Sequence, residues 1–277
     1  MGLVTNASDD LDWRPVADYL LVEIGYAVPE HKFYLLDRAC RPLLAEIEGR
    51  TVADLLRRIR DDRSLQQRLV NAVTINESLF FRDGKLWNDL TERVWPMLVE
   101  EVSFKRRIDV LLCACAAGQE LYTLAMLREE AAASLRGLPM AITAIDVDTD
   151  ALARAKAGCY SAFELSRGLD EVRRRRWFTE LPNGEFQADR RLLAEVQFRQ
   201  ANLTQALPFV SRYDLVLCRN VLIYFDPDGK RQVFDRLARI CNSYGFLVLG
   251  GTETTWGVTD AWRQRRLGST TFYQKVY

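Results

Sequence analysis

The chain has 277 residues, of which 48% are hydrophobic and 27% charged; this excludes a largely disordered protein and leaves room for a larger domain with a smaller companion. Its 38 lysines and arginines equal its 38 aspartates and glutamates, so it lacks the overall positive charge that nonspecific nucleic-acid binding needs. No apolar run approaches the roughly eighteen residues of a membrane span and no secretory leader begins the chain, which predicts a cytoplasmic protein that neither inserts into a membrane nor binds nucleic acid.

The first part of the chain is predicted to be helical. Residues 15 to about 75 contain no strand-like run, which indicates a small N-terminal helical domain over residues 1–75. Thr51 followed by Asp54 is typical of a helix start. Apolar residues then recur at helical spacing, namely Val52, Leu55, Leu56 and Ile59.

Residues 76–106 are predicted to link this domain to the rest through a helix from about Leu86 to Val102. Before that helix stand Phe80, Phe81 and Arg82, which suggest a lid-like patch whose arginine can hold a carboxylate bidentately. The alternative is a packing hinge with a solvated charge.

From residue 107 onward, short apolar runs alternate with helical segments. Strands are predicted over residues 108–114, 141–145, 214–218, 245–249 and 271–276, and helices over residues 121–130, 149–157 and 228–241. This alternation predicts an α/β domain over residues 107–277 with a mostly parallel sheet and helices on both faces. The last strand is expected at the sheet edge.

The alternation lapses between Gly158 and Asn202. Two short strands, at Phe186 and at residues 196–198, are predicted around Pro182-Asn183-Gly184. We expect a short β-subdomain inserted at about residues 178–200. The run Arg173–Arg176 is expected to be a solvated helix face.

Ligands of open parallel sheets bind beyond the carboxyl ends of the strands, and two features lie there. The loop Cys115–Glu120 consists largely of small residues, and Asp146 ends the second strand, where a carboxylate can accept both hydroxyls of a ribose. The G-x-G-x-x-G pattern is absent, which favours an adenosyl ligand without phosphates. A helix cap is an equally good interpretation of Asp146.

The segment Cys218–Asp226 follows another strand. Here Asn220 could read an adenine or position a sulfonium, and Tyr224 could line a methyl-transfer site. Alternatively Tyr224 and Phe225 are core aromatics and Asp226 caps the next helix. A buried Arg219–Asn220 pair would be costly without a partner.

Together these segments resemble one family, the chemoreceptor glutamate methyltransferases (the CheR family). Residues 76–83 are similar to its N-E-T-x-F-F-R-D segment, 114–123 to A-G-C-S-T-G-E-E-P-Y-S, 143–150 to A-T-D-I-S, and 214–226 to F-D-L-I-F-C-R-N-V-L-I-Y-F-D. The resemblance spans roughly residues 17 to 275. It implies the Rossmann-like fold of class I methyltransferases and S-adenosylmethionine as cofactor, with S-adenosylhomocysteine as product.

The resemblance also implies site residues. Those expected to contact the cofactor are Asn76, Ser78, Arg82, Glu120, Asp146, Asn202, Leu203, Asn220 and Val221. Arg82 and Tyr224 are expected to act in catalysis. Ser78 replaces the family's threonine, Ala114 a common glycine, and Gln119 the first of two glutamates.

The implied reaction methylates glutamate side chains in the cytoplasmic domain of a bacterial chemoreceptor. A glutamate carboxylate is already an anion at neutral pH and needs no general base. This suits a chain whose only histidine is His31 and whose cysteines form no C-x-x-C pair, which also predicts no metal site. A non-catalytic sensor or receptor-docking module that binds the cofactor or its product stays open, because of Gln119.

Some members of the family capture a C-terminal receptor peptide by adding it as a strand to an inserted β-subdomain. Here the turn Glu180–Glu185 is compact and holds one glycine, and Pro182 lacks a backbone donor. We therefore predict no such tether and direct recognition through the helical domain. A tether site at Arg190, Arg191 and the strand at Val196 is the alternative.

Overall fold

The computed structural model describes residues 11–102, 107–208 and 212–276. The chain divides into two compact units, residues 1–75 and residues 76–277. Residues 76–102, predicted as a linker, therefore belong to the larger unit, because Trp87 and Trp95 of this stretch are buried in its core. The last part of the predicted linker, residues 103–106, lies outside the described residues.

The first unit is helical, as the sequence predicts. Its described part contains α1 (Arg14–Ile24), α2 (Phe33–Ala45), α3 (Val52–Asp61) and α4 (Arg63–Val73). Thr51 caps α3 by accepting a hydrogen bond from the Asp54 backbone N–H at 3.1 Å, and Asp62 caps α4 in the same way. The core packs fully buried leucines from each helix, namely Leu20, Leu36, Leu55 and Leu69.

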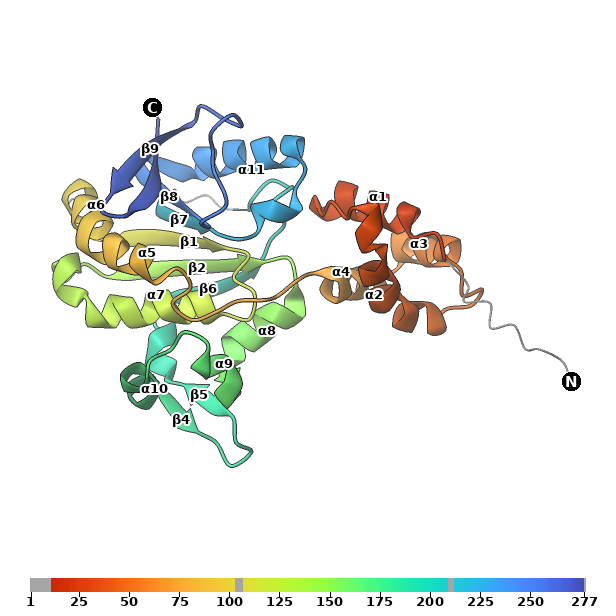
Figure 1. The fold of residues 1–277 in the computed structure, drawn as a ribbon, viewed down its shortest axis with the longest axis horizontal. Coiled ribbons are helices and arrows are strands. Elements are labelled where there is room, and N and C mark those ends of the chain that lie inside the picture. Colours follow the sequence, from red (N-terminus) through yellow and green to blue (C-terminus); the bar gives the residue numbers. More distant parts are fainter. Residues whose placement is uncertain (1–10, 103–106, 209–211, 277) are drawn as a thin grey trace, which may run out of the picture. The chain divides into compact units, whose positions relative to one another are not determined.

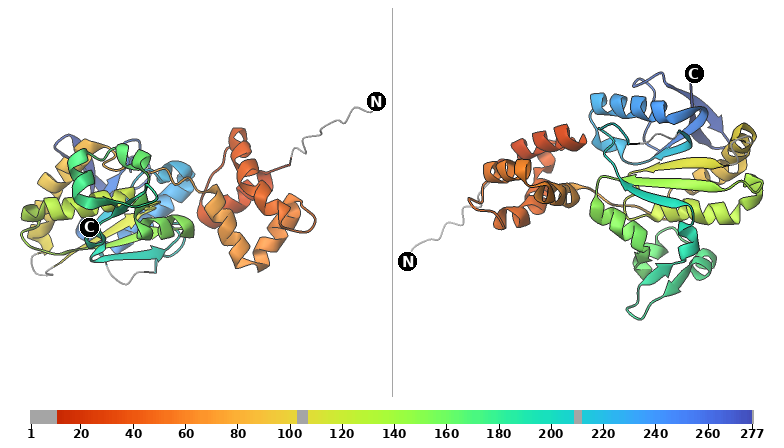
Figure 2. Two further views of the ribbon diagram at one scale, coloured as in Figure 1. Left: turned by 90° about the horizontal axis from the view of Figure 1, so that it is seen from below. Right: turned by 180° about the vertical axis from the view of Figure 1, so that it is seen from behind.

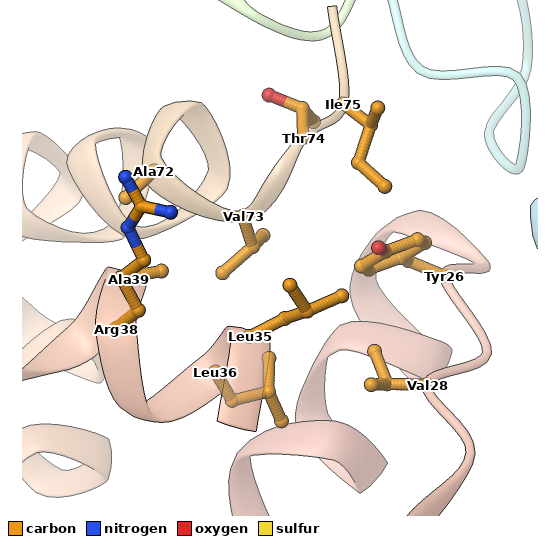
Figure 3. A pocket seen from close by; sticks show the side chains of 10 residues that line it. All are labelled: Tyr26, Val28, Leu35, Leu36, Arg38, Ala39, Ala72, Val73, Thr74 and Ile75. Atoms are coloured by element: carbon orange, nitrogen blue, oxygen red, sulfur yellow. The ribbon is translucent and has the colours of Figure 1, made fainter. Parts of the chain in front are cut away.

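A cavity of about 320 Å³ opens in this first unit. Its lining is mainly apolar, with Val28, Leu35 and Val73 around the cavity and Arg38 as the only charged side chain in the lining (Figure 3). No acidic side chain lies in the lining.

A seven-stranded sheet forms the centre of the second unit, in the order β6-β2-β1-β7-β8-β10-β9 (Figure 1). The strands are β1 (Ile108–Cys113), β2 (Met140–Asp146), β6 (Val196–Gln200), β7 (Tyr213–Cys218), β8 (Cys241–Leu249), β9 (Trp262–Leu267) and β10 (Thr270–Lys275). The five strands from β6 to β8 are parallel, while β10 and β9 run antiparallel. This confirms a mostly parallel α/β sheet.

Helices cover both faces of this sheet, because residues of its central strands are apolar on both sides. One face packs against α5 (Gly84–Asp89), α6 (Trp95–Val102) and α7 (Gln119–Glu130), and the other packs against α11 (Pro227–Ile240). A π-helical turn over Leu90–Val94 joins α5 to α6, so the helix predicted from Leu86 to Val102 is present with one irregular turn. The remaining large-unit helix on the sheet, α8 (Thr149–Ala157), follows β2 as predicted.

Two predictions about the sheet edges are wrong. The C-terminal strand β10 lies between β8 and β9 rather than at the edge, and the edge strand β9 was not predicted, because its sequence Trp-Arg-Gln-Arg-Arg-Leu is mostly polar. Residues 196–198 belong to β6, which pairs in parallel with β2 instead of with the strand at Phe186.

The inserted β-subdomain is therefore placed differently from the prediction. Its sheet has the order β3-β5-β4 and is built from β3 (Cys159–Tyr160), β4 (Phe178–Glu180) and β5 (Phe186–Ala188). It begins earlier than residue 178, and includes α9 (Ala162–Ser166) and α10 (Glu171–Trp177). Figures 1 and 2 show these elements together at one side of the large unit.

Candidate active site

The loop between β1 and α7 lies at the carboxyl edge of the sheet, where ligands of such folds bind. Its backbone takes left-handed conformations at Ala114, Ala116 and Gly118, with φ angles of 51°, 48° and 94°. A Cβ atom at Gly118 would lie 2.9 Å from the Cβ of Ala155, so both the φ angle and the packing there favour glycine. The small residues of this loop thus follow from its tight turns.

Asp146 at the end of β2 holds this loop in place. Its buried carboxylate accepts hydrogen bonds from the backbone N–H of Ala116 at 2.8 Å and of Asp148 at 2.9 Å. Burial raises the pKa of the Asp146 carboxyl, although these hydrogen bonds oppose the shift. The helix-cap interpretation of Asp146 is wrong: Asp148 caps α8, by accepting from the N–H of Asp150 and Ala151. The Val147 backbone N–H also acts on this carboxylate as a hydrogen-bond donor, and a carboxylate has about four acceptor positions, so about one position is left for a ribose hydroxyl.

The segment from Asn76 to Asp83 is anchored against the same edge. The Asn76 side-chain amide donates to the Asp148 carboxylate at 2.6 Å. Phe80 is fully buried, with ring centroids 5.1 Å from Tyr160 and 5.7 Å from Phe178 in edge-to-face geometry. The lid-like interpretation of this residue is therefore wrong, because Phe80 is a core anchor that fixes the segment to the β-subdomain.

Arg82 follows this anchor and is half-buried. Its carbonyl oxygen accepts hydrogen bonds from the Trp87 indole N–H at 2.9 Å and from Arg219 at 3.2 Å, so its backbone is fixed. Its guanidinium makes no hydrogen bond or ion pair with any described residue. Burial raises the pKa of Tyr224, and the positive charge of Arg82 opposes this shift, which places the two side chains within electrostatic reach of each other.

Arg219 is the buried charge at the centre of this edge. Its side chain is fully shielded from solvent and forms ion pairs with Glu120 and, at 2.6 Å, with Asp83. Its guanidinium also stands 5.3 Å from the centre of the Trp87 ring. Burial raises the pKa of Glu120, and Arg219 opposes the shift. The partner that the buried arginine requires is thus supplied by two carboxylates.

Glu253 organises the loops after β7 and β8. Its carboxylate accepts hydrogen bonds from the backbone N–H groups of Asn220, Leu222 and Gly250, each at 2.8 Å. Asn220 is thereby held in a left-handed conformation with φ of 58°. Downstream, Asp226 caps α11 by accepting from the Gly229 N–H, which confirms the capping interpretation of Asp226.

The remaining expected cofactor residues lie along the same edge. The Ala201 N–H donates to the Asp146 carbonyl at 3.0 Å, which brings Asn202 and the buried Leu203 beside the end of β2. Val221 is half-buried in the loop after β7, next to Asn220. Ser78 lies half-buried in the segment anchored by Asn76 and Phe80.

Comparison with known proteins identifies the family. The sequence pattern described as "CheR methyltransferase, SAM binding domain" matches residues 76–270. The chain belongs to the CheR methyltransferase family. It is 34% identical over 269 residues to the "Chemotaxis protein methyltransferase" of Vibrio anguillarum, covering 96% of this chain and 97% of that protein. Identity to "Chemotaxis protein methyltransferase 1" is 32% for both the Vibrio cholerae protein, with the same coverage, and the Pseudomonas aeruginosa protein, with 85% and 87%.

The CheR chain is thus an S-adenosylmethionine-dependent methyltransferase, and its residues fit that cofactor. The cofactor carries a ribose diol, an ammonium group and a carboxylate, and no phosphate. Carboxylates are available from Asp146 and Glu120, and an unpaired guanidinium from Arg82. In addition, the side-chain oxygen of Gln119 is buried in the first turn of α7 without a hydrogen-bond partner, so a ligand donor would satisfy it.

Two residues of this CheR site were missed by sequence reasoning. The sequence analysis treated Arg219 only as a buried charge that would be unfavourable without a partner. It did not consider Glu253 as a site residue. The signal for Glu253 was an acid in the glycine-rich stretch Gly250-Gly251-Thr252-Glu253, where exposed backbone N–H groups need an acceptor. The described residues contain no cluster of three metal-ligating side chains, and none of the helices they form is long and apolar enough to cross a membrane.

Proposed function

We propose that the chain transfers the methyl group of S-adenosylmethionine to glutamate side chains in the cytoplasmic domain of a bacterial chemoreceptor, giving glutamyl methyl esters. The observation that carries this proposal is the unpaired guanidinium of Arg82 near Tyr224, at the edge where the cofactor residues converge. The charges of Glu77 and Glu120 act on Arg82, but its guanidinium makes no hydrogen bond or close ion pair with a described residue and can therefore take up an incoming carboxylate. Relatives named as chemotaxis protein methyltransferases support the same reaction.

The bound cofactor supplies an electrophilic methyl group on a sulfonium centre. In the proposed step a substrate carboxylate oxygen forms a bond to the methyl carbon, the carbon–sulfur bond breaks, and its electron pair stays on sulfur. No proton moves, because the glutamate is already ionised at neutral pH. This agrees with the position of the only histidine, His31, in the other unit of the chain.

The contribution of the protein is orientation and exclusion of water. Arg82, fixed through its backbone by Trp87 and Arg219, would orient the substrate carboxylate. Tyr224 would border the path of the methyl group. We assign cofactor contacts to Asn76, Ser78, Arg82, Glu120, Asp146, Asn202, Leu203, Asn220 and Val221.

Arg82→Ala tests this assignment. We expect methyl transfer to receptor fragments to fall by about tenfold to a hundredfold, because the substrate carboxylate loses its orienting partner. Affinity for S-adenosylhomocysteine should fall less, as measured by calorimetric titration. The matched control is Arg239→Ala, on an exposed arginine of α11. Equal losses in both measurements would make Arg82 a cofactor ligand only, and unchanged transfer would remove it from the site.

We further propose that the helical unit, residues 1–75, recognises the receptor and that residues 107–277 carry out the transfer. The non-catalytic alternative is not favoured, because Glu120 and Asp146 are in place despite the substitution at Gln119, and because the relatives are named as methyltransferases. Binding of S-adenosylhomocysteine without any methyl transfer would revive it.

A further inference from the structure

The carboxylates nearest to Arg82 are bound by other groups of the protein. The buried guanidinium of Arg219 forms ion pairs with both Glu120 and Asp83. Another carboxylate belongs to Glu77, which precedes Arg82 in the same anchored segment. Arg82 can take up a substrate carboxylate only while its guanidinium is unpaired, so the partner of Glu77 matters for methyl transfer.

Glu77 lies close enough to Arg82 for their charges to act on each other and on Tyr224. A hydrogen bond from Arg167 lowers the pKa of the Glu77 carboxyl, and the positive charge of Arg82 adds to this shift. Burial raises the pKa of Tyr224; the charge of Arg82 opposes that shift, and the charge of Glu77 adds to it. A Glu77 carboxylate without a partner would therefore pair with Arg82 or repel an incoming glutamate.

Arg167 of the β-subdomain supplies the partner of Glu77. Its guanidinium donates a hydrogen bond to the Glu77 carboxylate at 2.8 Å, between positions 90 residues apart in the sequence. The exposed fractions of the two side chains are 39% for Arg167 and 65% for Glu77, so the ion pair contributes little to the stability of the fold. Its main consequence is the place and the neutralisation of the Glu77 charge.

The backbone that carries Arg167 is fixed against the anchored segment. Arg167 directly follows α9, which begins at a capping box formed by Ser161 and Glu164. The next residue, Gly168, has a φ angle of 102°, and a Cβ atom there would lie 2.0 Å from the carbonyl oxygen of Phe80. Only glycine allows this close approach. The ion pair therefore joins two segments whose backbones are already held together.

We propose that Arg167 is a positioning residue for methyl transfer: by holding and neutralising Glu77, it keeps the guanidinium of Arg82 available to the substrate carboxylate. Arg167 acts through Glu77 and not on the reacting atoms. The inference rests on the proposed function and adds to it a residue of the β-subdomain. This subdomain would thus contribute to methyl transfer without capturing a receptor peptide.

The test is a double-mutant cycle of Arg167→Ala and Glu77→Gln in the full chain, with a receptor cytoplasmic fragment as substrate. In Arg167→Ala the released Glu77 pairs with Arg82 for part of the time, and the apparent affinity for the substrate falls in proportion to the fraction of Arg82 that stays unpaired. We expect KM for the fragment to rise about fivefold, with kcat and the affinity for S-adenosylhomocysteine within about twofold of the unmodified chain.

The second substitution separates positioning from a purely structural role. Glu77→Gln alone and the double variant should both have a KM within about twofold of the unmodified chain, because neither retains a carboxylate that competes for Arg82. If the ion pair only tied two segments together, Glu77→Gln would raise KM as much as Arg167→Ala does, and the double variant would not recover. That pattern, or an unchanged KM in Arg167→Ala, would overturn the proposal.

Arg154→Ala is the matched control. It removes a similar exposed ion pair, at 2.9 Å to Glu164, which joins α8 to α9 (Figure 1), and it should leave KM unchanged. In an Arg82→Ala background, Arg167→Ala should have no further effect on KM, and a further rise would contradict an action through Arg82. If the unmodified chain methylates no receptor cytoplasmic domain, the proposed function fails; if it does and the KM effects are absent, only this inference fails.

Discussion

Arg219 carries a full positive charge on a side chain that solvent does not reach, between carboxylates from two other segments of the chain. Removing one partner of a buried pair is more damaging than the net strength of the pair suggests, because the remaining charge stays desolvated. The arginine also fixes the backbone at Arg82. Arg219 would therefore affect catalysis indirectly, by positioning other residues such as Arg82.

For Arg219→Met we expect a loss of about 3–5 kcal/mol in the free energy of unfolding. Burial already raises the pKa of Glu120, and loss of the arginine would raise it further. A carboxyl whose pKa is raised in the folded state destabilises the fold as the pH rises through that pKa. The loss in the free energy of unfolding caused by Arg219→Met should therefore be smaller at about pH 5 than at about pH 8. Thermal unfolding across this range measures it, with the surface variant Arg175→Met as control; a deficit independent of pH would contradict the role of Glu120.

Asp146 combines two roles, one shown by its contacts and one proposed. Asp146→Ala should weaken S-adenosylhomocysteine binding by about 2–3 kcal/mol, through loss of charge-assisted hydrogen bonds to the ribose. It should also lower thermal stability, because the Ala116 and Asp148 N–H groups lose their acceptor. Calorimetric titration checks the first effect, and Asp260→Ala on the surface serves as control. If Asp146→Ala bound S-adenosylhomocysteine as tightly as the unmodified chain, Asp146 would only shape the loop.

At this scale the sequence locates individual residues better than pairs. Asp146 and Asn220 could be placed at strand ends because the strands themselves are short apolar runs with clear limits. The partnership of Arg219 with Glu120 joins positions 99 residues apart, which no local pattern contains. The same holds for Glu253, whose three donors come from two loops.

Among the elements, the β-subdomain determines whether a peptide can be added as a strand. Its outer strand β4 is three residues long, and the turn after it is closed by hydrogen bonds between Leu181 and Glu185 and between Gly184 and Leu181. Such a short edge offers few backbone groups to a partner. The tether site suggested at Arg190, Arg191 and Val196 is not part of this small sheet, because β6 lies in the main sheet.

We therefore expect no low-micromolar binding of an aromatic-containing C-terminal receptor pentapeptide to the chain, by calorimetry. Methylation of a receptor that lacks such a tail should proceed at the same rate as methylation of one that has it. A clear isotherm of that strength would refute the expectation.

Elements with a strong apolar pattern were found correctly, although β10 was placed at the sheet edge; of the two true edge strands, β6 was paired wrongly and β9 was not predicted. β6 and β9 each bury few side chains, so neither gives the continuous apolar run of a central strand. The Pro182-Asn183-Gly184 turn favours a hairpin on local grounds, but the two strands that it joins are β4 and β5. The pairing of β6 with β2 depends on contacts about fifty residues apart, which a local pattern does not contain.

On the scale of the whole molecule, the expected cofactor residues and the buried clusters around the main sheet and the β-subdomain all lie within residues 76–277. A fragment of these residues should therefore fold and bind S-adenosylhomocysteine within about threefold of the full chain. Its methyl transfer to a receptor fragment should be much weaker, if residues 1–75 recognise the receptor. Calorimetry and a radiolabelled-methyl assay on both proteins test this, and full transfer by the fragment would remove the recognition role.

The open sheet has two outer strands, and both carry charge. β9 contributes Arg263, Arg265 and Arg266, and β6 contributes Arg199. Because the formal net charge is 0, general repulsion between copies of the chain is weak. Local repulsion between like-charged strand edges then opposes edge-to-edge aggregation. Neutralising the arginines of β9 would thus threaten colloidal stability even where folding and cofactor binding are unaffected.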